Sequence, residues 1–319
     1  MTVQLGYVGQ RNTHLMVPII ASESILNRDG TRTPSFYLSG NPTLRAEAGL
    51  AKITASTGPQ DYDCLQLVFQ KRYSRGLEFQ ANYTWSKCMT NDRGFYGQLG
   101  SGGQAAVQGH WQNSYDAAAD WGPCYYDVQH AFNGFVTYDL PFGKDRALGH
   151  GANKVLNGIV GDWQINMLLN VRGGFPLTIA NYTDSSQTGS RDPRASCVAP
   201  PDVFGYMNSP RGGYQWFNPN SYAAPTIGSF GNCGVGTVRG PGFHAADLSL
   251  SKRFIIHEKA NLEVRAEAIN VTNTPILNAP NATVPGTVVA TGSIGTGLFG
   301  QITSAQGARN VQFALKLHF

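Results

Sequence analysis

The sequence contains little charge and no long hydrophobic run. Charged residues make up 14% of the 319 residues, and no stretch approaches the roughly 18 consecutive apolar residues that a transmembrane helix requires. This absence excludes helical membrane proteins. It does not exclude strands that cross a membrane, because such strands alternate polar and apolar side chains. The net charge of +4 is spread along the chain without a Lys/Arg run, so nucleic acid is not an expected partner.

Recognisable catalytic motifs are also absent. There is no HExxH, GxSxG, P-loop or Rossmann fingerprint, and the Gly-rich residues 97–103 lack the Lys-Ser/Thr and helix that complete a phosphate-binding loop. No cysteine pair forms a CxxC motif, and no His/Cys spacing matches a zinc site. We therefore expect no enzymatic activity, no catalytic residue, no cofactor and no metal site.

Cysteine is scarce, with five residues in the chain. In an oxidising compartment we expect two loop disulfides, Cys88 with Cys124 and Cys197 with Cys233, which would leave Cys64 unpaired. Because sequence does not determine connectivity, five unlinked thiols are the alternative.

Glycine and aromatic residues are plentiful, with 38 Gly, 16 Phe and 14 Tyr, a composition that favours strands and turns. Strict two-residue alternation of apolar and polar side chains recurs in segments close to the ten or so residues of a tilted membrane strand. Eight segments qualify: residues 2–9, 62–71, 77–85, 132–140, 163–171, 246–251, 262–268 and 311–319. The predicted fold class is all-β, an antiparallel transmembrane β-barrel segment of about eight long strands.

The connections between these segments alternate in length. Residues 72–76 and 255–260 are short and residues 141–161 are intermediate, whereas residues 10–61, 86–130, 172–242 and 270–310 are long. Barrels show this rhythm because tight periplasmic turns lie at one rim and extracellular loops at the other. The Gly, Pro, Asn and Ser content of the long loops predicts irregular structure.

Alternation by itself does not distinguish a barrel from a soluble β-sandwich. Aromatic residues near strand ends fit the girdles of a membrane barrel, although a soluble sheet also has strand-end aromatics; they are Tyr83, Trp85, Tyr138, Phe142 and Trp163. Charged residues on the polar faces, such as Glu263, Arg265 and Lys316, fit either a wet lumen or solvent.

Several motifs in series resemble one family. They are DYDCLQLVFQKRYSRGLEFQANYTWSK (61–87), DVQHAFNGFVTYDLPFGKDR (127–146), GDWQINMLLNVRGGFPLTI (161–179), FNPNSYAAPTIGSFGNCGVGTVRGPGFHAADLSLSKRF (217–254), LEVRAEAINVTNTP (262–275) and FGQITSAQGARNVQFALKLHF (299–319). In this order they resemble the C-terminal barrel portion of TonB-dependent outer-membrane receptors. Within these the chain is most similar to the Oar-like group, whose members commonly carry a carboxypeptidase-regulatory-like domain.

The resemblance implies a barrel of about 22 strands preceded by a plug. Eight strands cover only part of such a wall, so residues 1–319 are expected to be the C-terminal part of the barrel, with the plug and the N-terminal strands absent. Residues 1–10 lack the charged start and apolar core of a secretory signal, so an upstream part is expected to be missing. If the eight strands do not close alone, the segment forms a partial barrel or a curved open sheet.

The resemblance also implies location and partners. We expect the chain in the outer membrane of a Gram-negative-type bacterium, in contact with lipid, with TonB reached only through the missing N-terminal parts. The aromatic Phe319 is the expected signal for the barrel-assembly machinery.

The long extracellular loops are the candidate ligand-binding surface. Aromatic rings there suit stacking against sugars, peptides or hydrophobic ligands, and arginines suit an anionic group; the candidates are Tyr96, Trp111, Tyr115, Trp121, Tyr125, Arg191, Arg211 and Trp216. The alternative is that the rings pack the loops against the barrel rim. The predicted function is the barrel segment of a TonB-dependent transporter, and the alternatives are a surface adhesion or structural barrel and a soluble β-sandwich binding module.

Overall fold

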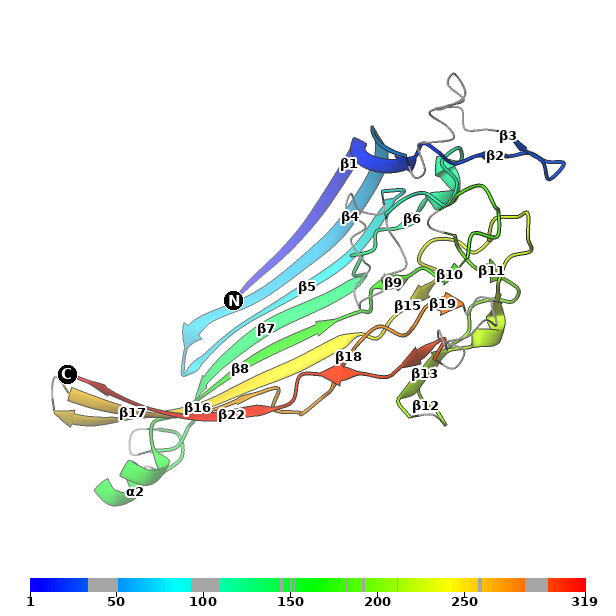
Figure 1. Ribbon diagram of the computed structural model, residues 1–319. Helices are drawn as coiled ribbons and strands as arrows, with labels where there is room; N and C mark the ends of the chain where they lie inside the picture. Colours follow the sequence, from blue (N-terminus) through cyan, green and yellow to red (C-terminus); the bar gives the residue numbers. More distant parts are fainter. Residues whose placement is uncertain are drawn as a thin grey trace.

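The computed structural model describes residues 1–33, 51–92, 109–143, 146–149, 151, 153–181, 183–190, 193–210, 212–257, 260–284 and 298–319. In these residues the protein is nearly all-β, and one curved antiparallel sheet dominates it (Figure 1). No helix within the described ranges is long and apolar enough to cross a membrane.

The main sheet confirms all eight predicted strands. In spatial order they are β1 (Thr2–Ile20), β4 (Lys52–Ser74), β5 (Leu77–Thr90), β7 (His130–Asp139), β8 (Trp163–Arg172), β16 (Phe243–His257), β17 (Ala260–Ile269) and β22 (Asn310–His318). The short β6 (Gly122–Pro123) also pairs with β5. Strands β1 and β22 are not paired with each other, so the described sheet is open.

Several predicted boundaries are wrong, including that of the connection 86–130, since β5 continues to Thr90. Residues 10–61 were expected to form a loop, but β1 continues to Ile20 and β4 begins at Lys52, so much of this segment extends the hairpin. The alternation is hidden there because the register shifts on both sides of Leu15, which changes the face that the following side chains occupy. The predicted turn at residues 255–260 is shorter, because β16 reaches His257.

The register brings the apolar side chains of neighbouring strands onto one face. One row runs through successive partners on six strands: Phe79, Val136, Met167, Leu248, Ala268 and Val311. Several side chains of this face are exposed: Val136 is 37% exposed, Val311 is 56% exposed, and Phe313, two residues further along β22, is 81% exposed. An apolar face of this extent indicates contact with a nonaqueous environment, as on the lipid side of a barrel.

The opposite face carries an equally continuous polar row. Successive partners are Glu78, Thr137, Asn166, Ser249, Glu267 and Gln312. Because each of these residues adjoins a member of the apolar row in sequence, strand pleating alone separates the two rows. We call the polar face the inner wall.

One end of the sheet has the short connections. At the turn from β4 to β5, Arg75 and Gly76 both have positive φ, 54° and 76°, the geometry of a two-residue hairpin turn that matches strand twist. The intermediate connection contains the helix α2 (Lys154–Val160) at this same end, where the C-terminus also lies (Figure 1).

The other end carries a packed cap, which we define as the described residues of 21–33, 91–129, 173–242 and 270–309 (Figure 1). The loops were expected to be irregular, but they contain short strands and 3-10 turns: β2 (Ile25–Leu26), β3 (Arg32–Thr33), η2 (Ala117–Asp120), β9 (Pro176–Leu177), β10 (Ala180–Asn181), β11 (Ser196–Cys197), β12 (Val203–Asn208), β13 (Tyr214–Phe217), η3 (Pro219–Ser221), β14 (Tyr222–Ala223), β15 (Val238–Arg239), β18 (Ile276–Leu277), β19 (Thr283–Val284), β20 (Gln301–Ile302) and β21 (Ala305–Gln306).

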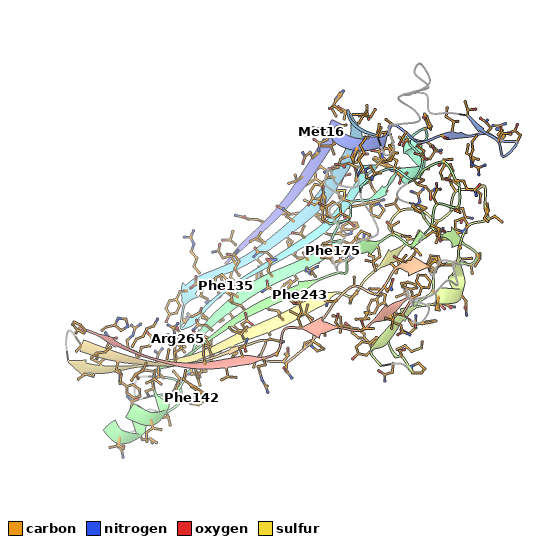
Figure 2. The ribbon with its side chains drawn as sticks, viewed as in Figure 1. Met16, Phe135, Phe142, Phe175, Phe243 and Arg265 are labelled. Atoms are coloured by element: carbon orange, nitrogen blue, oxygen red, sulfur yellow. A yellow bond between two sulfur atoms is a disulfide. The ribbon has the colours of Figure 1, made fainter. Side chains whose placement is uncertain are left out.

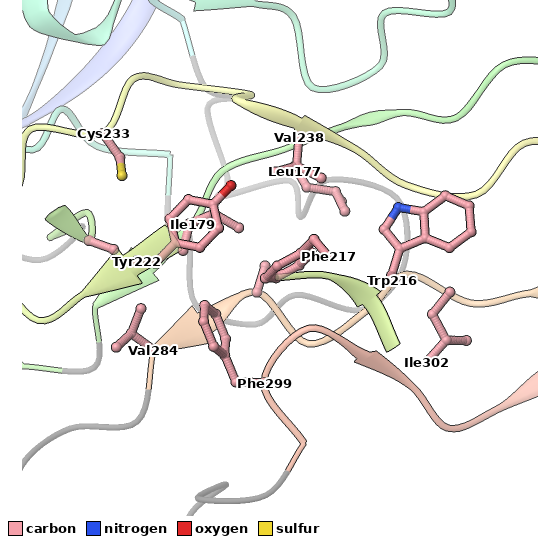
Figure 3. Close-up of a cluster of buried hydrophobic side chains, with 12 residues drawn as sticks. Leu177, Ile179, Trp216, Phe217, Tyr222, Cys233, Val238, Val284, Phe299 and Ile302 are labelled. Atoms are coloured by element: carbon pink, nitrogen blue, oxygen red, sulfur yellow. The ribbon is translucent and has the colours of Figure 1, made fainter. Parts of the chain in front are cut away.

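A hydrophobic core joins two of the four cap segments, residues 173–242 and 270–309. Phe217 is fully buried at its centre and meets Tyr222 and Phe299 edge to face, with ring centroids 5.5 Å and 5.2 Å away (Figure 3). Most of its residues come from the connection 173–242, and the others come from 270–309, so the core packs these two connections against each other.

Candidate functional site

Two disulfides brace the cap. The structure joins Cys88 to Cys124 and Cys197 to Cys233, each across 36 residues. These are the pairs that the sequence favours, and Cys64 is a buried free thiol on β4. The first bridge ties the cap to the end of β5, and the second lies within the connection between β8 and β16.

A buried ion pair links two of the cap loops. The guanidinium of Arg194 contacts the carboxylate of Asp120, and their side chains are 4% and 0% exposed. Arg194 also donates from Nε to the carbonyl of Cys233 at 2.8 Å and from Nη2 to that of Ala119 at 2.9 Å. The second oxygen of Asp120 accepts from the backbone N–H of Gln112 at 3.0 Å. These hydrogen bonds offset the free-energy cost of burying both charges.

A second pair joins the cap to the Cys88 bridge. The Asp127 carboxylate is fully buried; one oxygen accepts from the backbone N–H of Cys88 at 2.8 Å, and the other meets the guanidinium of Arg239. Arg239 also donates to the carbonyl of Gly174 at 3.1 Å. This network holds β15 next to the end of β5.

Glu23 is buried where three cap segments meet. Its carboxylate accepts from the backbone N–H of Ser114 at 2.9 Å and from the Thr188 hydroxyl at 3.1 Å. Burial raises the pKa of Glu23 to about 7, because the charged form loses its hydration; the hydrogen bonds from Ser114 and Thr188 oppose this shift. The group therefore changes charge near neutral pH.

The structure places two predicted ligand-binding residues inside the cap. Trp111 is 5% exposed, packs with Val17 and Ile19, and donates from Nε1 to the carbonyl of Asn91 at 2.8 Å. Trp216 is 7% exposed and donates to the carbonyl of Arg239 at 2.7 Å. Neither indole offers a stacking face at the surface, which corrects the expectation that both face a ligand. Their rings pack the loops, as the alternative interpretation had it.

The other predicted aromatic residues are more accessible. Trp121 is 38% exposed, and the half-buried Tyr125 packs edge-on against Tyr126. Tyr115 is half-buried, and its hydroxyl donates to the carbonyl of Glu23 at 2.9 Å. Of these, Trp121 presents the largest surface for a ligand.

Three further candidates, Tyr96, Arg191 and Arg211, lie outside the described residues. The role of Phe319 in assembly stays a prediction; its side chain is 98% exposed.

The inner wall carries a charged ladder along β17. Arg265 donates from Nε to Glu263 at 2.9 Å and from Nη1 to Glu267 at 3.2 Å, and Gln312 of β22 donates to the other oxygen of Glu267 (Figure 2 labels Arg265). On β8, Gln164 donates to Asp139 at 3.0 Å. The wall is therefore hydrogen-bonded within itself and presents polar groups to the enclosed side.

Hollows formed by described residues open on this face. One, of about 220 Å³, lies over Asn166, Ser249 and Glu267, with Asp247 beside it. A second, of about 210 Å³, lies where the inner wall meets the cap and is lined by Arg172, Phe175, Phe243 and Asn278, among others. Sequence reasoning placed Arg172 at the start of a loop and assigned it no role.

Sequence reasoning also missed Glu23, Asp120, Asp127 and Arg239. Each is charged and lies in a connection, the pattern of a solvated loop residue, and no local signal marks its burial. Their partners lie 39 to 165 residues away in the chain.

A comparison with family models finds one that covers nearly the whole chain. The model described as an outer membrane beta barrel domain matches residues 1–312. No curated protein matches the chain.

Proposed function

Because the chain belongs to the outer membrane beta barrel domain family and lies in the outer membrane, we propose that it forms part of the wall and the outer cap of a transport protein. More specifically, we propose the barrel segment of a TonB-dependent receptor of the Oar-like group. The motifs quoted above from residues 61–319 support this subtype. The proposal assigns no catalytic role to any residue.

One observation carries the proposal: in the described part of the chain, the eight long strands with a polar inner wall do not close on one another. A barrel of eight strands encloses only its own side chains, whereas a wider barrel holds an aqueous passage or a plug. Strands β1 and β22 are unpaired with each other, and lipid does not tolerate open edges. A barrel completed by further strands is wide enough for a solute.

We also propose partners for this protein. Lipid covers the apolar face, and the barrel-assembly machinery recognises the segment that ends in Phe319. In the proposed receptor, TonB acts through a plug domain.

The principal rival is a surface adhesion or structural barrel that only anchors its loops. The internally bonded cap fits such a role, because a rigid surface is suited to contacts with other cells. A soluble β-sandwich does not fit an outer-membrane family or the uncovered apolar face.

A steric test separates transport from anchoring. In the complete protein in its host, Ser249→Trp places an indole on the inner wall beside Glu267, and Leu248→Trp places the same ring on the lipid face. We expect Ser249→Trp to lower uptake of one class of nutrient among sugars, peptides and hydrophobic compounds. Leu248→Trp should leave that uptake unchanged, because lipid accommodates the ring.

The measurement is growth on single nutrients together with cell attachment. Loss of growth on one nutrient after deletion of the gene, with attachment intact, supports transport. If deletion abolishes attachment and changes no nutrient uptake, the adhesion role holds and the transport proposal is wrong.

A further inference from the structure

Arg172 occupies an unusual position at the boundary between the inner wall and the cap. It is the last residue of β8 and shares the polar face with Asn166 and Asn170. Its guanidinium carbon lies 4.3 Å from the ring centroid of Phe175 and 5.4 Å from that of Phe243 (Figure 2 labels both rings). The two phenyl rings restrict the guanidinium by cation–π contact.

The guanidinium has no acceptor among the described residues. Other half-buried or buried arginines in these ranges have acceptors: Arg194 meets Asp120, Arg239 meets Asp127, and Arg32 donates to the carbonyl of Ser186. Arg172 is half-buried, yet no described carboxylate or carbonyl accepts from it. Partial burial of a cation without hydrogen-bond acceptors costs free energy unless a ligand supplies those acceptors.

The hollow beside Arg172 has the form of a small ligand site. Its volume is about 210 Å³, and apolar side chains of Leu177, Ile276 and Leu277 form part of its wall. The amides at its rim already have partners, because Gln306 Nε2 donates to Asn278 Oδ1 at 3.1 Å. The guanidinium of Arg172 is therefore the charged group that is available to a ligand in a largely preformed site.

We propose that this hollow binds the carboxylate of a small organic ligand, with the guanidinium of Arg172 donating two parallel hydrogen bonds. The apolar body of the ligand lies against Ile276 and Leu277. A planar guanidinium matches a carboxylate with two bonds, which a lysine cannot reproduce. The inference rests on the proposed transport function, since the hollow lies where the inner wall meets the cap.

Binding is measured by titration calorimetry on the full chain in detergent, with benzoate and its neutral counterpart benzamide as probes. We expect benzoate to bind roughly tenfold or more tightly than benzamide, because a charge-assisted hydrogen bond distinguishes the two. Arg172→Gln should abolish the preference, and Arg172→Lys should retain only part of it. Far-ultraviolet circular dichroism checks that each variant keeps its strands.

The matched control is Arg309→Gln, which removes an exposed positive charge in the cap outside the hollow. It should keep the full preference for benzoate. Equal binding of the two probes by the unmodified chain, or an undiminished preference in Arg172→Gln, overturns the site. Since binding is measured without uptake, the two proposals can fail separately. Equal binding of the two probes by the unmodified chain, with uptake by the complete protein intact, rejects this site alone. A preference for benzoate in the unmodified chain, without uptake by the complete protein, rejects the transport proposal alone.

Discussion

At the scale of single residues, buried charged groups connect the loops of the cap. Glu23, Asp120 and Asp127 are each shielded from solvent and each bonded to segments distant in sequence. Loop residues of this kind stabilise the cap only while their charge and partners match. A change of pH or of one side chain should therefore loosen the cap and leave the sheet intact.

Glu23 should make the cap less stable as pH rises. Its pKa in the folded protein is about 7, above the 4.5 of a free carboxyl, so the folded cap holds the proton more tightly than the unfolded one. Stability is fully present below pH 4.5 and falls as pH rises through about 7, by roughly 3 kcal/mol at most. Glu23→Gln should remove this part of the dependence, measured as the thermal midpoint of near-ultraviolet circular dichroism between pH 5 and pH 8.

An exposed acid of the same segment is the control. Hydrogen bonds from Thr31 lower the pKa of Asp29, so Asp29 stays ionised throughout this range. The thermal midpoint of Asp29→Asn should therefore fall with pH as steeply as that of the unmodified protein. If the thermal midpoint of Glu23→Gln fell as steeply with pH as that of the unmodified protein, Glu23 would not be the source of the pH dependence.

Arg194→Met should destabilise the cap strongly. The substitution leaves the Asp120 carboxylate buried without its counter-charge, which costs about 3–5 kcal/mol. Urea titration followed by near-ultraviolet circular dichroism measures the loss. Adding Asp120→Leu should restore part of it, because the stranded charge is then gone; no recovery in the double variant would contradict a paired role.

At the scale of the element, the two-residue alternation of apolar and polar side chains decides which face of the sheet each side chain occupies. Leu248 and Ser249 are neighbours on β16 but lie on opposite faces, in the apolar and the polar row respectively. Arginine near the membrane midplane should cost roughly 2–4 kcal/mol on the lipid side and much less on the lumen side.

Leu248→Arg should therefore reduce stability far more than Ser249→Arg. At position 249 the new guanidinium lies next to Glu267, its cross-strand neighbour, which favours the pair. Urea unfolding of both variants in lipid vesicles gives the comparison. Equal losses would mean that the assignment of the two faces is wrong.

The whole molecule is a curved sheet with a cap at one end and open edges at β1 and β22. If further strands complete the barrel, these two edges do not meet within one chain in the membrane. The pair Leu5→Cys and Leu315→Cys should then fail to form a disulfide under oxidation in the outer membrane. Gel mobility before and after reduction measures the result.

Neighbouring strands supply the positive control. Val264 and Leu315 are direct partners on β17 and β22, so cysteines at these two positions should cross-link efficiently. An efficient Leu5–Leu315 cross-link within one chain would instead show that the eight strands close on themselves.

Local chemistry explains how much of this protein could be predicted. All eight strands, their two faces and the outer-membrane location follow from alternating side chains and motifs in series. Alternation has that power because strand pleating converts a two-residue period directly into two faces. It failed between residues 10 and 20, where a shift of register at Leu15 breaks the period.

The cap and its sites depended on the tertiary structure. Glu23 meets Thr188 across 165 residues, and Asp120 meets Arg194 across 74. Arg172 gains its significance only because Phe175, Phe243 and the loop around Ile276 surround it. A local pattern records which face a side chain takes, but burial and charge pairing between distant loops arise from the packing of the whole chain, so the sequence determined the strands and the fold determined the sites.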